Sequence, residues 1–181
     1  MQKILITLLS LCLAGLPFAA QAEPDLVILV RHAEKATDQG NDPGLSEAGQ
    51  SRAQTLARVL QHSAVSSIYT SHYKRTHETA QALAQAQGIT AQVVQGSGAD
   101  HLQQLLAAVR ASMGTVLVVG HGNTVPALAM ALGAPAMKDF CESSFSHMLV
   151  LRPSSQPGKP AELVQAHYGE ADIIKPSADC Q

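Results

Sequence analysis

Short apolar runs alternate with longer amphipathic segments along most of the chain. The runs that favour strands are rich in branched or apolar residues and cover Leu26–Val30, Ser67–Thr70, Gln92–Gln95, Thr115–Val119 and His147–Leu151. The first and fourth runs, LVILV and TVLVV, are apolar at every position, which is typical of strands covered on both faces. This alternation predicts an α/β fold with one mainly parallel sheet.

The segments between these runs carry helix signals. The segment SEAGQSRAQTLARVLQH begins with Ser46, a good N-cap, and places Ala53, Leu56, Ala57 and Leu60 on one helical face. The next two helices are expected to end at Gly88 and Gly114, because glycine commonly terminates a helix. Near the end of the chain, RPSSQPGKPA is expected to be a surface loop or a hairpin connection.

Composition limits the classes of protein to consider. With 181 residues, 46% of them hydrophobic, the chain can bury one sizeable core but has little room for two domains. The formal net charge of −2 does not suggest a nucleic-acid-binding protein steered by a basic surface. The high apolar content also argues against disorder, although only 14% of the residues are charged.

The first segment, residues 1–22, has the pattern of a cleaved secretory signal peptide. A single Lys3 precedes a short apolar stretch, and Ala20-Gln21-Ala22 fits a small-residue cleavage site. The alternative of a membrane anchor is disfavoured because the stretch is short for a span of ~20 residues. A lipid anchor on Cys12 is disfavoured by the bulky residue before it. We therefore expect one mature domain, residues 23–181, located in the periplasm without a stable membrane anchor.

Removal of residues 1–22 leaves two cysteines, Cys141 and Cys180. An even number of cysteines in an oxidising compartment favours a disulfide, here one that ties the C-terminal tail to the domain. The alternative is two unpaired thiols.

Basic and imidazole side chains follow three of the expected strands. Arg31 and His32 follow the first strand, Arg75 comes just after the second, and His121 follows the fourth. Open α/β sheets bind ligands at the carboxyl ends of their strands, so we expect these side chains to converge. Two guanidinium groups with two imidazoles suit a tetrahedral dianion such as phosphate. The adjacent arginines and the absence of familiar ligand motifs argue against a metal at this site.

Four segments, in this order, resemble the histidine phosphatase superfamily, whose fold is phosphoglycerate mutase-like. They are LVRHAEKA, DPGLSEAGQSRA, IYTSHYKRTHETA and VLVVGHGNT, and the resemblance extends from Leu26 to Leu151. It implies a three-layer α/β/α sandwich around the mainly parallel sheet. It also implies that His32 is the nucleophile that becomes phosphorylated, that Arg31 and Arg75 bind the phosphoryl oxygens, and that His121 stabilises the transferring group. No metal or organic cofactor is implied.

The general acid that protonates the leaving oxygen is harder to place. Ala33 replaces the usual glycine after the Arg-His pair, and Gly122 stands where one branch of the family has an aspartate. The first acidic candidate is Asp100, which could equally be a helix N-cap. The second is Glu34, which could instead pair with Lys35 or be solvated. Without either acid, the enzyme would need a good leaving group, as in a phosphohistidine, acyl phosphate or diphosphate.

Several further residues admit two interpretations. Asn123 either orients the pocket or turns the chain into the next helix, and Ser71 either lines the pocket entrance or is a bystander. Thr124 is expected to be an N-cap and Glu78 to form an ion pair on the helix surface. The remaining histidines that we considered are expected to be ordinary surface or core residues: His62, His101, His147 and His167.

We therefore expect an exported phosphatase that hydrolyses phosphate monoesters or related phosphoryl compounds, with phosphorylated envelope sugars as candidate substrates. Its partner would be a phosphorylated small molecule or glycan. A phosphomutase, a protein-phosphohistidine phosphatase and a non-catalytic periplasmic phosphate-binding module are the alternatives.

Overall fold

The computed structural model describes residues 23–37, 40–154, 156, 158–172 and 180. The predicted signal peptide, residues 1–22, lies outside the described residues. Within the described ranges, no helix combines the length and the apolar character that crossing a membrane requires.

One six-stranded sheet forms the centre of the molecule, in the order β3-β2-β4-β1-β5-β6. The strands are β1 Leu26–Arg31, β2 Val65–Thr70, β3 Gln92–Val93, β4 Thr115–Gly120, β5 His147–Arg152 and β6 Glu162–His167. The first four strands along this order pair in parallel, whereas β5 is antiparallel to both β1 and β6. The predicted mainly parallel sheet is therefore confirmed, with an antiparallel hairpin at one edge.

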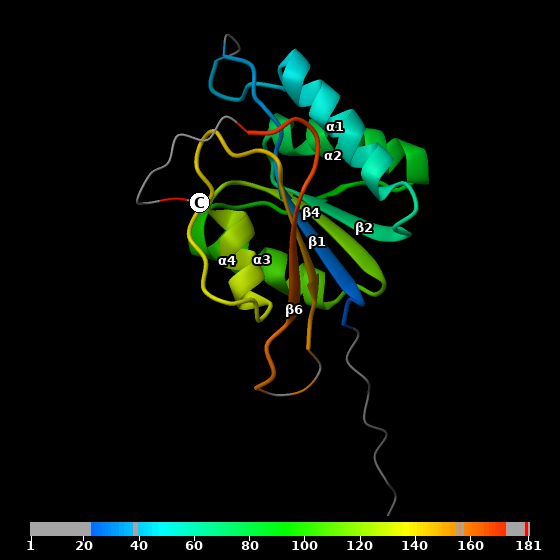
Figure 1. Ribbon diagram of the computed structural model, residues 1–181, viewed down its shortest axis with the longest axis vertical. Coiled ribbons are helices and arrows are strands. Elements are labelled where there is room, and N and C mark those ends of the chain that lie inside the picture. The colour runs from blue at the N-terminus through cyan, green and yellow to red at the C-terminus, as the bar shows by residue number, and fades with distance from the viewer. Residues whose placement is uncertain (1–22, 38–39, 155, 157, 173–179, 181) are drawn as a thin grey trace, which may run out of the picture.

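Helices cover both faces of this sheet. They are α1 Glu47–Leu60, α2 Lys74–Gln87, α3 Gly98–Arg110 and α4 Thr124–Ala131. The first two lie together on one face, and α3 and α4 lie on the other (Figure 1). The predicted three-layer sandwich is thus present.

The alternation of side chains along a strand explains why the core has two layers. Val27 and Leu29 of β1 belong to the cluster that packs against α3 and α4, whereas Ile28 and Val30 belong to the cluster beneath α1 and α2. Successive side chains of a strand point to opposite faces, so a strand covered on both faces must be apolar throughout. All four of these side chains are at most 2% exposed. This double burial makes β1 a rigid support for the residues that follow it.

Helix ends agree with the sequence at some positions and differ at others. Ser46 caps α1 by accepting a hydrogen bond from Gly49, and Gly88 ends α2 with a φ of 66°. The prediction for α3 was wrong, because this helix ends at Arg110 and Gly114 is instead a turn residue with a φ of 73° just before β4. Strand β6 was missed, because its exposed edge position leaves it with little apolar pattern.

Residues 139–146 form the loop directly before β5, and a disulfide holds it. Cys141 in this loop is bonded to Cys180 near the end of the chain, as the sequence predicted. The loop also pairs with the turn before α4, since Phe140 donates a backbone hydrogen bond of 2.9 Å to Gly122. It is therefore held against the carboxyl ends of the parallel strands.

Candidate active site

A cavity of about 480 Å³ opens at the carboxyl ends of the parallel strands. Its walls include the four side chains that the sequence placed after three different strands, namely Arg31, His32, Arg75 and His121. The topology of the sheet brings these residues together although up to 90 positions separate them in the chain.

His32 is buried at 4% exposure and its tautomer is set by the backbone. Its Nδ1–H donates to the Ala33 carbonyl at 2.8 Å, which puts the ring's lone pair on Nε2. Burial lowers the pKa of His32 to about 3, with the nearby Arg31 acting in the same direction against the Ala33 hydrogen bond. The imidazole is therefore neutral at pH 7 and able to act as a nucleophile.

His121 lies beside His32, with 5.4 Å between the ring centroids in an edge-to-face arrangement. Its Nε2 bonds the Ser71 hydroxyl at 3.0 Å, and its backbone N–H donates to Thr124 Oγ1 at 2.8 Å. Burial and then the charge of Arg75 lower the pKa of His121 to about 4. Thr124 thus supports His121 from the first position of α4, and Asn123, rather than Thr124, occupies the N-cap position.

Arg31 is held rigidly by the 139–146 loop. Its Nη1 donates to the carbonyls of Cys141 and Ser144 at 2.6 and 3.1 Å, and its Nη2 to Glu142 Oε2 at 3.0 Å. The guanidinium also lies 4.5 Å from the centre of the Phe145 ring. Three of its contacts therefore orient the charge without neutralising it, whereas the exposed Glu142 carboxylate forms an ion pair with it.

Arg75 enters from the first turn of α2. It stacks over the Tyr73 ring at 4.2 Å and lies 3.8 Å from Asp42. Among the described residues, the Nε atoms of both Arg31 and Arg75 are buried without a hydrogen-bond partner. A buried donor without a partner is costly and calls for an explanation. An oxyanion held between the two arginines would satisfy both donors.

Two further residues predicted for the site, Ser71 and Asn123, also line the cavity. The two acid candidates do not. Glu34 is turned toward Arg52, with its carboxylate 2.8 to 3.0 Å from the guanidinium, so its ion-pair partner is Arg52 rather than Lys35. Asp100 is exposed in the first turn of α3, and the N-cap position of that helix belongs to Ser97.

Other functional side chains of the cavity wall are Lys35, His72, Tyr73, His101, Asp139 and Glu142. Among them, Tyr73, Asp139 and Glu142 were not expected there from the sequence. His101 was expected to be ordinary, but it is buried at the cavity wall with Nδ1 3.3 Å from the Gln95 carbonyl. The string KDFCESS contains the two missing carboxylates, yet nothing in its pattern shows that it folds back over the first strand.

The prediction for Glu78 needs correction, and the structure gives a reason for Gly122. Glu78 was expected to form an ion pair on the helix surface, but its carboxylate accepts the backbone N–H of Leu45 at 2.7 Å. At Gly122, a Cβ would lie 3.0 Å from the Phe140 carbonyl oxygen. The position after His121 is therefore tight for any side chain, the aspartate of the other branch included.

The comparisons with known proteins agree with this geometry. The family model of the histidine phosphatase superfamily (branch 1) matches residues 27–96, which include Arg31, His32 and Arg75. No curated protein sequence matches the chain.

Solved structures match over most of the chain. A protein of Nakamurella multipartitia assigned as the phosphohistidine phosphatase SixA is 27% identical, with a TM-score of 0.55 over 82% of this chain and 98% of its own. A SixA protein of Agrobacterium tumefaciens is 25% identical, with a TM-score of 0.54 over 79% and 99%. The mycobacterial glucosyl-3-phosphoglycerate phosphatase in complex with inorganic phosphate, at 19% identity, a TM-score of 0.59 and coverage of 81% and 98%, shares the fold.

The matched motif segment contains the nucleophile candidate and both arginines, and the fold is shared over 82% of the chain with a structure that is 27% identical. The chain is therefore similar to the histidine phosphatase superfamily (branch 1) in its motif segment and in its fold.

Proposed function

We propose that this protein is a phosphatase that transfers the phosphoryl group of its substrate to His32 and then to water. The observation that carries the proposal is the pair of buried arginine Nε–H groups that have no partner among the described residues, beside a neutral, oriented histidine. Arginine's fork matches phosphate oxygens, and a neutral imidazole is the form that attacks phosphorus.

In the first step, the phosphoryl group lies between Arg31 and Arg75, and Nε2 of His32 attacks the phosphorus. A P–N bond forms while the P–O bond to the leaving group breaks. The Nδ1–H bond to Ala33 holds the ring in line and stabilises its developing positive charge. His121 stabilises the charge that builds up on the phosphoryl oxygens. In the second step, water attacks the phosphohistidine, orthophosphate leaves and His32 is restored.

The leaving oxygen of an ordinary ester needs a proton. Asp139 and Glu142 are the carboxyl side chains that line the cavity, so we assign the general acid to one of them in place of Asp100 and Glu34. Glu142 lies beside the phosphoryl-binding arginine, with Oε2 3.0 Å from Arg31 Nη2. A missing acid would slow hydrolysis of an ordinary ester by ~10²–10⁴-fold.

The proposed substrates are phosphate monoesters exposed outside the cytoplasm, such as phosphorylated envelope sugars. The export signal in residues 1–22 supports that location. The wall formed by His72 and Tyr73, whose ring centroids are 4.1 Å apart with planes inclined at 35°, offers aromatic faces of the kind that contact a sugar ring. A protein phosphohistidine is the second candidate, favoured by the two structural relatives assigned as SixA.

The test is a phosphatase assay with EDTA present, using p-nitrophenyl phosphate, acetyl phosphate, a sugar phosphate and a phosphohistidine peptide. Wild type should turn over, and His32→Ala should lose at least about 10³-fold in kcat, as expected for a nucleophile. His62→Ala, which removes an exposed histidine outside the cavity, is the matched control and should keep full activity. Alkali-quenched wild type should carry phosphate on His32.

The result also separates the alternatives. Wild-type protein that binds orthophosphate but turns over no substrate would be a binding module. Transfer to a second hydroxyl instead of to water would indicate a mutase. Turnover of the phosphohistidine peptide with no hydrolysis of the sugar phosphate would move the substrate from envelope sugars to proteins.

A further inference from the structure

A second histidine pair lies on the antiparallel hairpin, outside the wall of the cavity. His147 begins β5 and is paired directly with His167 at the end of β6. Residues directly opposite each other in an antiparallel pair project their side chains on the same face. The two imidazole rings are accordingly close, with centroids 4.7 Å apart.

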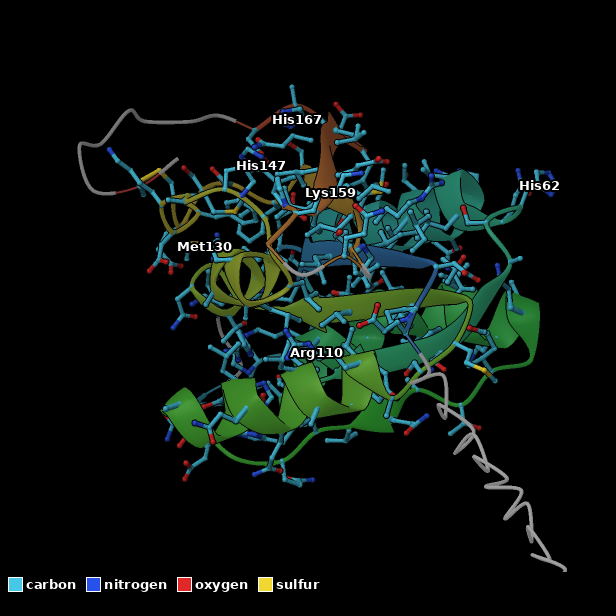
Figure 2. The ribbon with its side chains drawn as sticks, turned by 90° about the horizontal axis from the view of Figure 1, so that it is seen from below. His62, Arg110, Met130, His147, Lys159 and His167 are labelled. Carbon is cyan, nitrogen blue, oxygen red and sulfur yellow. A yellow bond between two sulfur atoms is a disulfide. The ribbon has the colours of Figure 1, made fainter. Side chains whose placement is uncertain are left out.

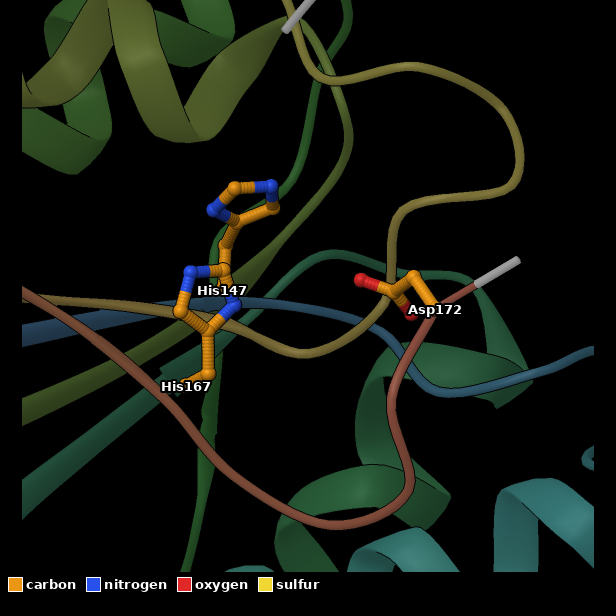
Figure 3. A group of neighbouring side chains, drawn as sticks. All are labelled: His147, His167 and Asp172. Carbon is orange, nitrogen blue, oxygen red and sulfur yellow. The ribbon is translucent and has the colours of Figure 1, made fainter. Parts of the chain in front are cut away.

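Asp172 completes this cluster from the segment that follows β6. One ligand atom from each of His147, His167 and Asp172 lies within 4.8 Å of the others. Figure 3 shows the two imidazoles one above the other, with one carboxylate oxygen of Asp172 pointing toward them. The Asp172 side chain is only 2% exposed, which is rare for a carboxylate without a compensating charge.

The charged side chains around Asp172 neutralise its carboxylate only in part. Arg52, at 3.8 Å, is the nearest cation, but that guanidinium already binds the Glu34 carboxylate through shorter contacts of 2.8 to 3.0 Å.

His147 has an unused nitrogen. Its Nε2 is buried, and no described residue is within hydrogen-bonding reach of it. A ring nitrogen without a partner among the described residues is available to bind a metal ion. Stacking on Phe140, with centroids 4.5 Å apart, fixes the ring where it lies.

We propose that His147, His167 and Asp172 form a binding site for a divalent transition-metal ion, with zinc as the expected occupant. Two imidazole nitrogens and one carboxylate oxygen, with a fourth position open to water, are a donor set that zinc uses in proteins. Tetrahedral zinc with bonds of ~2.0–2.1 Å sets its ligand atoms about 3.3 Å apart, so the cluster must contract by at most about 1.5 Å. The exposed His167 side chain can make this movement.

Contacts around the cluster already orient its members. The Ser146 hydroxyl bonds His167 Nδ1 at 2.8 Å and donates to Asp172 Oδ2 at 2.6 Å. Outer contacts of this kind hold metal ligands in place. Asp172 also accepts the backbone N–H groups of Phe145 and Ser146, and so ties the cluster to the 139–146 loop. The ion's role is structural, because it would fasten this loop rather than take part in phosphoryl transfer.

The experiment is a titration of the chelator-stripped protein with ZnCl₂, followed by isothermal calorimetry and by thermal unfolding. We expect one zinc equivalent with a Kd below about 10 μM and a Tm that rises with zinc concentration. His167→Ala should weaken binding at least about tenfold, on the scale of ligand-shell losses. Because His167 is exposed, this variant is expected to fold.

Two controls test whether the site is specific. His62→Ala removes an exposed histidine that lies far from the cluster in Figure 2 and should bind zinc like wild type. His32→Ala removes one histidine of the cavity pair, His32 and His121, and should also bind zinc unchanged. X-ray absorption of the zinc complex should show two histidine ligands.

Absence of zinc binding, equal binding by wild type and His167→Ala, or loss of binding in His32→Ala would each overturn the proposal. None of these measurements depends on catalytic turnover, so failure here would leave the proposed phosphatase activity untouched.

Discussion

Two histidine pairs in this protein have similar spacing and opposite surroundings. The rings of His32 and His121 are 5.4 Å apart and lie between two arginines, whereas the rings of His147 and His167 are 4.7 Å apart and lie beside a buried aspartate. Burial lowers the pKa of His32, His121 and His147 alike, so these imidazoles start from the same neutral state. The charge of the neighbouring side chains, rather than the histidines, then decides between an anion and a cation as ligand.

The two pairs also differ in their support. His32 and His121 lie at the carboxyl ends of parallel strands that are buried on both faces, while the second pair lies on an edge hairpin. The 139–146 loop contacts both pairs, because Phe145 lies 6.2 Å from the His32 ring and Phe140 stacks on His147. This loop is the physical connection between the two regions.

Among changes that keep both histidine pairs, the largest expected effect is the loss of an arginine beside His32 and His121. Arg75→Ala should lower kcat/KM by about 10²–10³-fold, because one of the two donors that stabilise the transferring phosphoryl group is lost. It should leave zinc binding at the other pair unchanged. Arg75→Lys keeps the charge but not the fork, and should recover only part of the loss. Steady-state kinetics and zinc titration of the same preparations check this. Equal activity of Arg75→Ala and wild type would contradict an anion-binding role for the two arginines of the cavity.

The disulfide offers a way to disturb both pairs together. Replacing Cys141 and Cys180 by alanine should lower the free energy of unfolding by about 2–4 kcal/mol, because the crosslink closes a long segment of the unfolded chain. It should also weaken both phosphate and zinc binding, since Cys141 supplies a carbonyl to Arg31 from the loop that Asp172 holds. Urea unfolding and the two titrations measure this. Lower stability with both affinities intact would make the two regions independent.

The smallest effect concerns the dependence of stability on pH. His32 has a pKa of about 3 in the fold and an ordinary value of 6.5 in the unfolded chain, so the unfolded state binds more protons between these values. The stability associated with its neutral form is therefore present above pH 6.5 and is lost as the pH falls toward 3. Between pH 7 and pH 5, wild type should lose about 2 kcal/mol more than His32→Gln. Urea unfolding at the two pH values tests this, and equal losses would mean that His32 is not held neutral.

The local pattern of the sequence was enough to predict most of the frame. Continuous apolar runs indicated strands buried on both faces, and Ser46 and Gly88 marked the helix ends where the structure has them. The positions of the polar residues after the strands were enough to predict that four of them meet at one edge of the sheet, namely Arg31, His32, Arg75 and His121. These features depend on period and on chain direction, which can be read from a single sequence.

The partners of these residues were decided only by the tertiary structure. Arg31 is oriented by carbonyls 110 and 113 positions away, and Glu34 is held by Arg52 rather than directed into the cavity. Asp139 and Glu142 reach the cavity because the 139–146 loop folds back, and His147 meets His167 because an unpatterned edge strand pairs with β5. The periodic pattern of apolar residues shows which face of a helix or strand a side chain occupies. The identity of its contacts depends on segments that only folding brings together. The sequence therefore determined which groups could perform the chemistry, and the three-dimensional packing determined which of them are in position to do so.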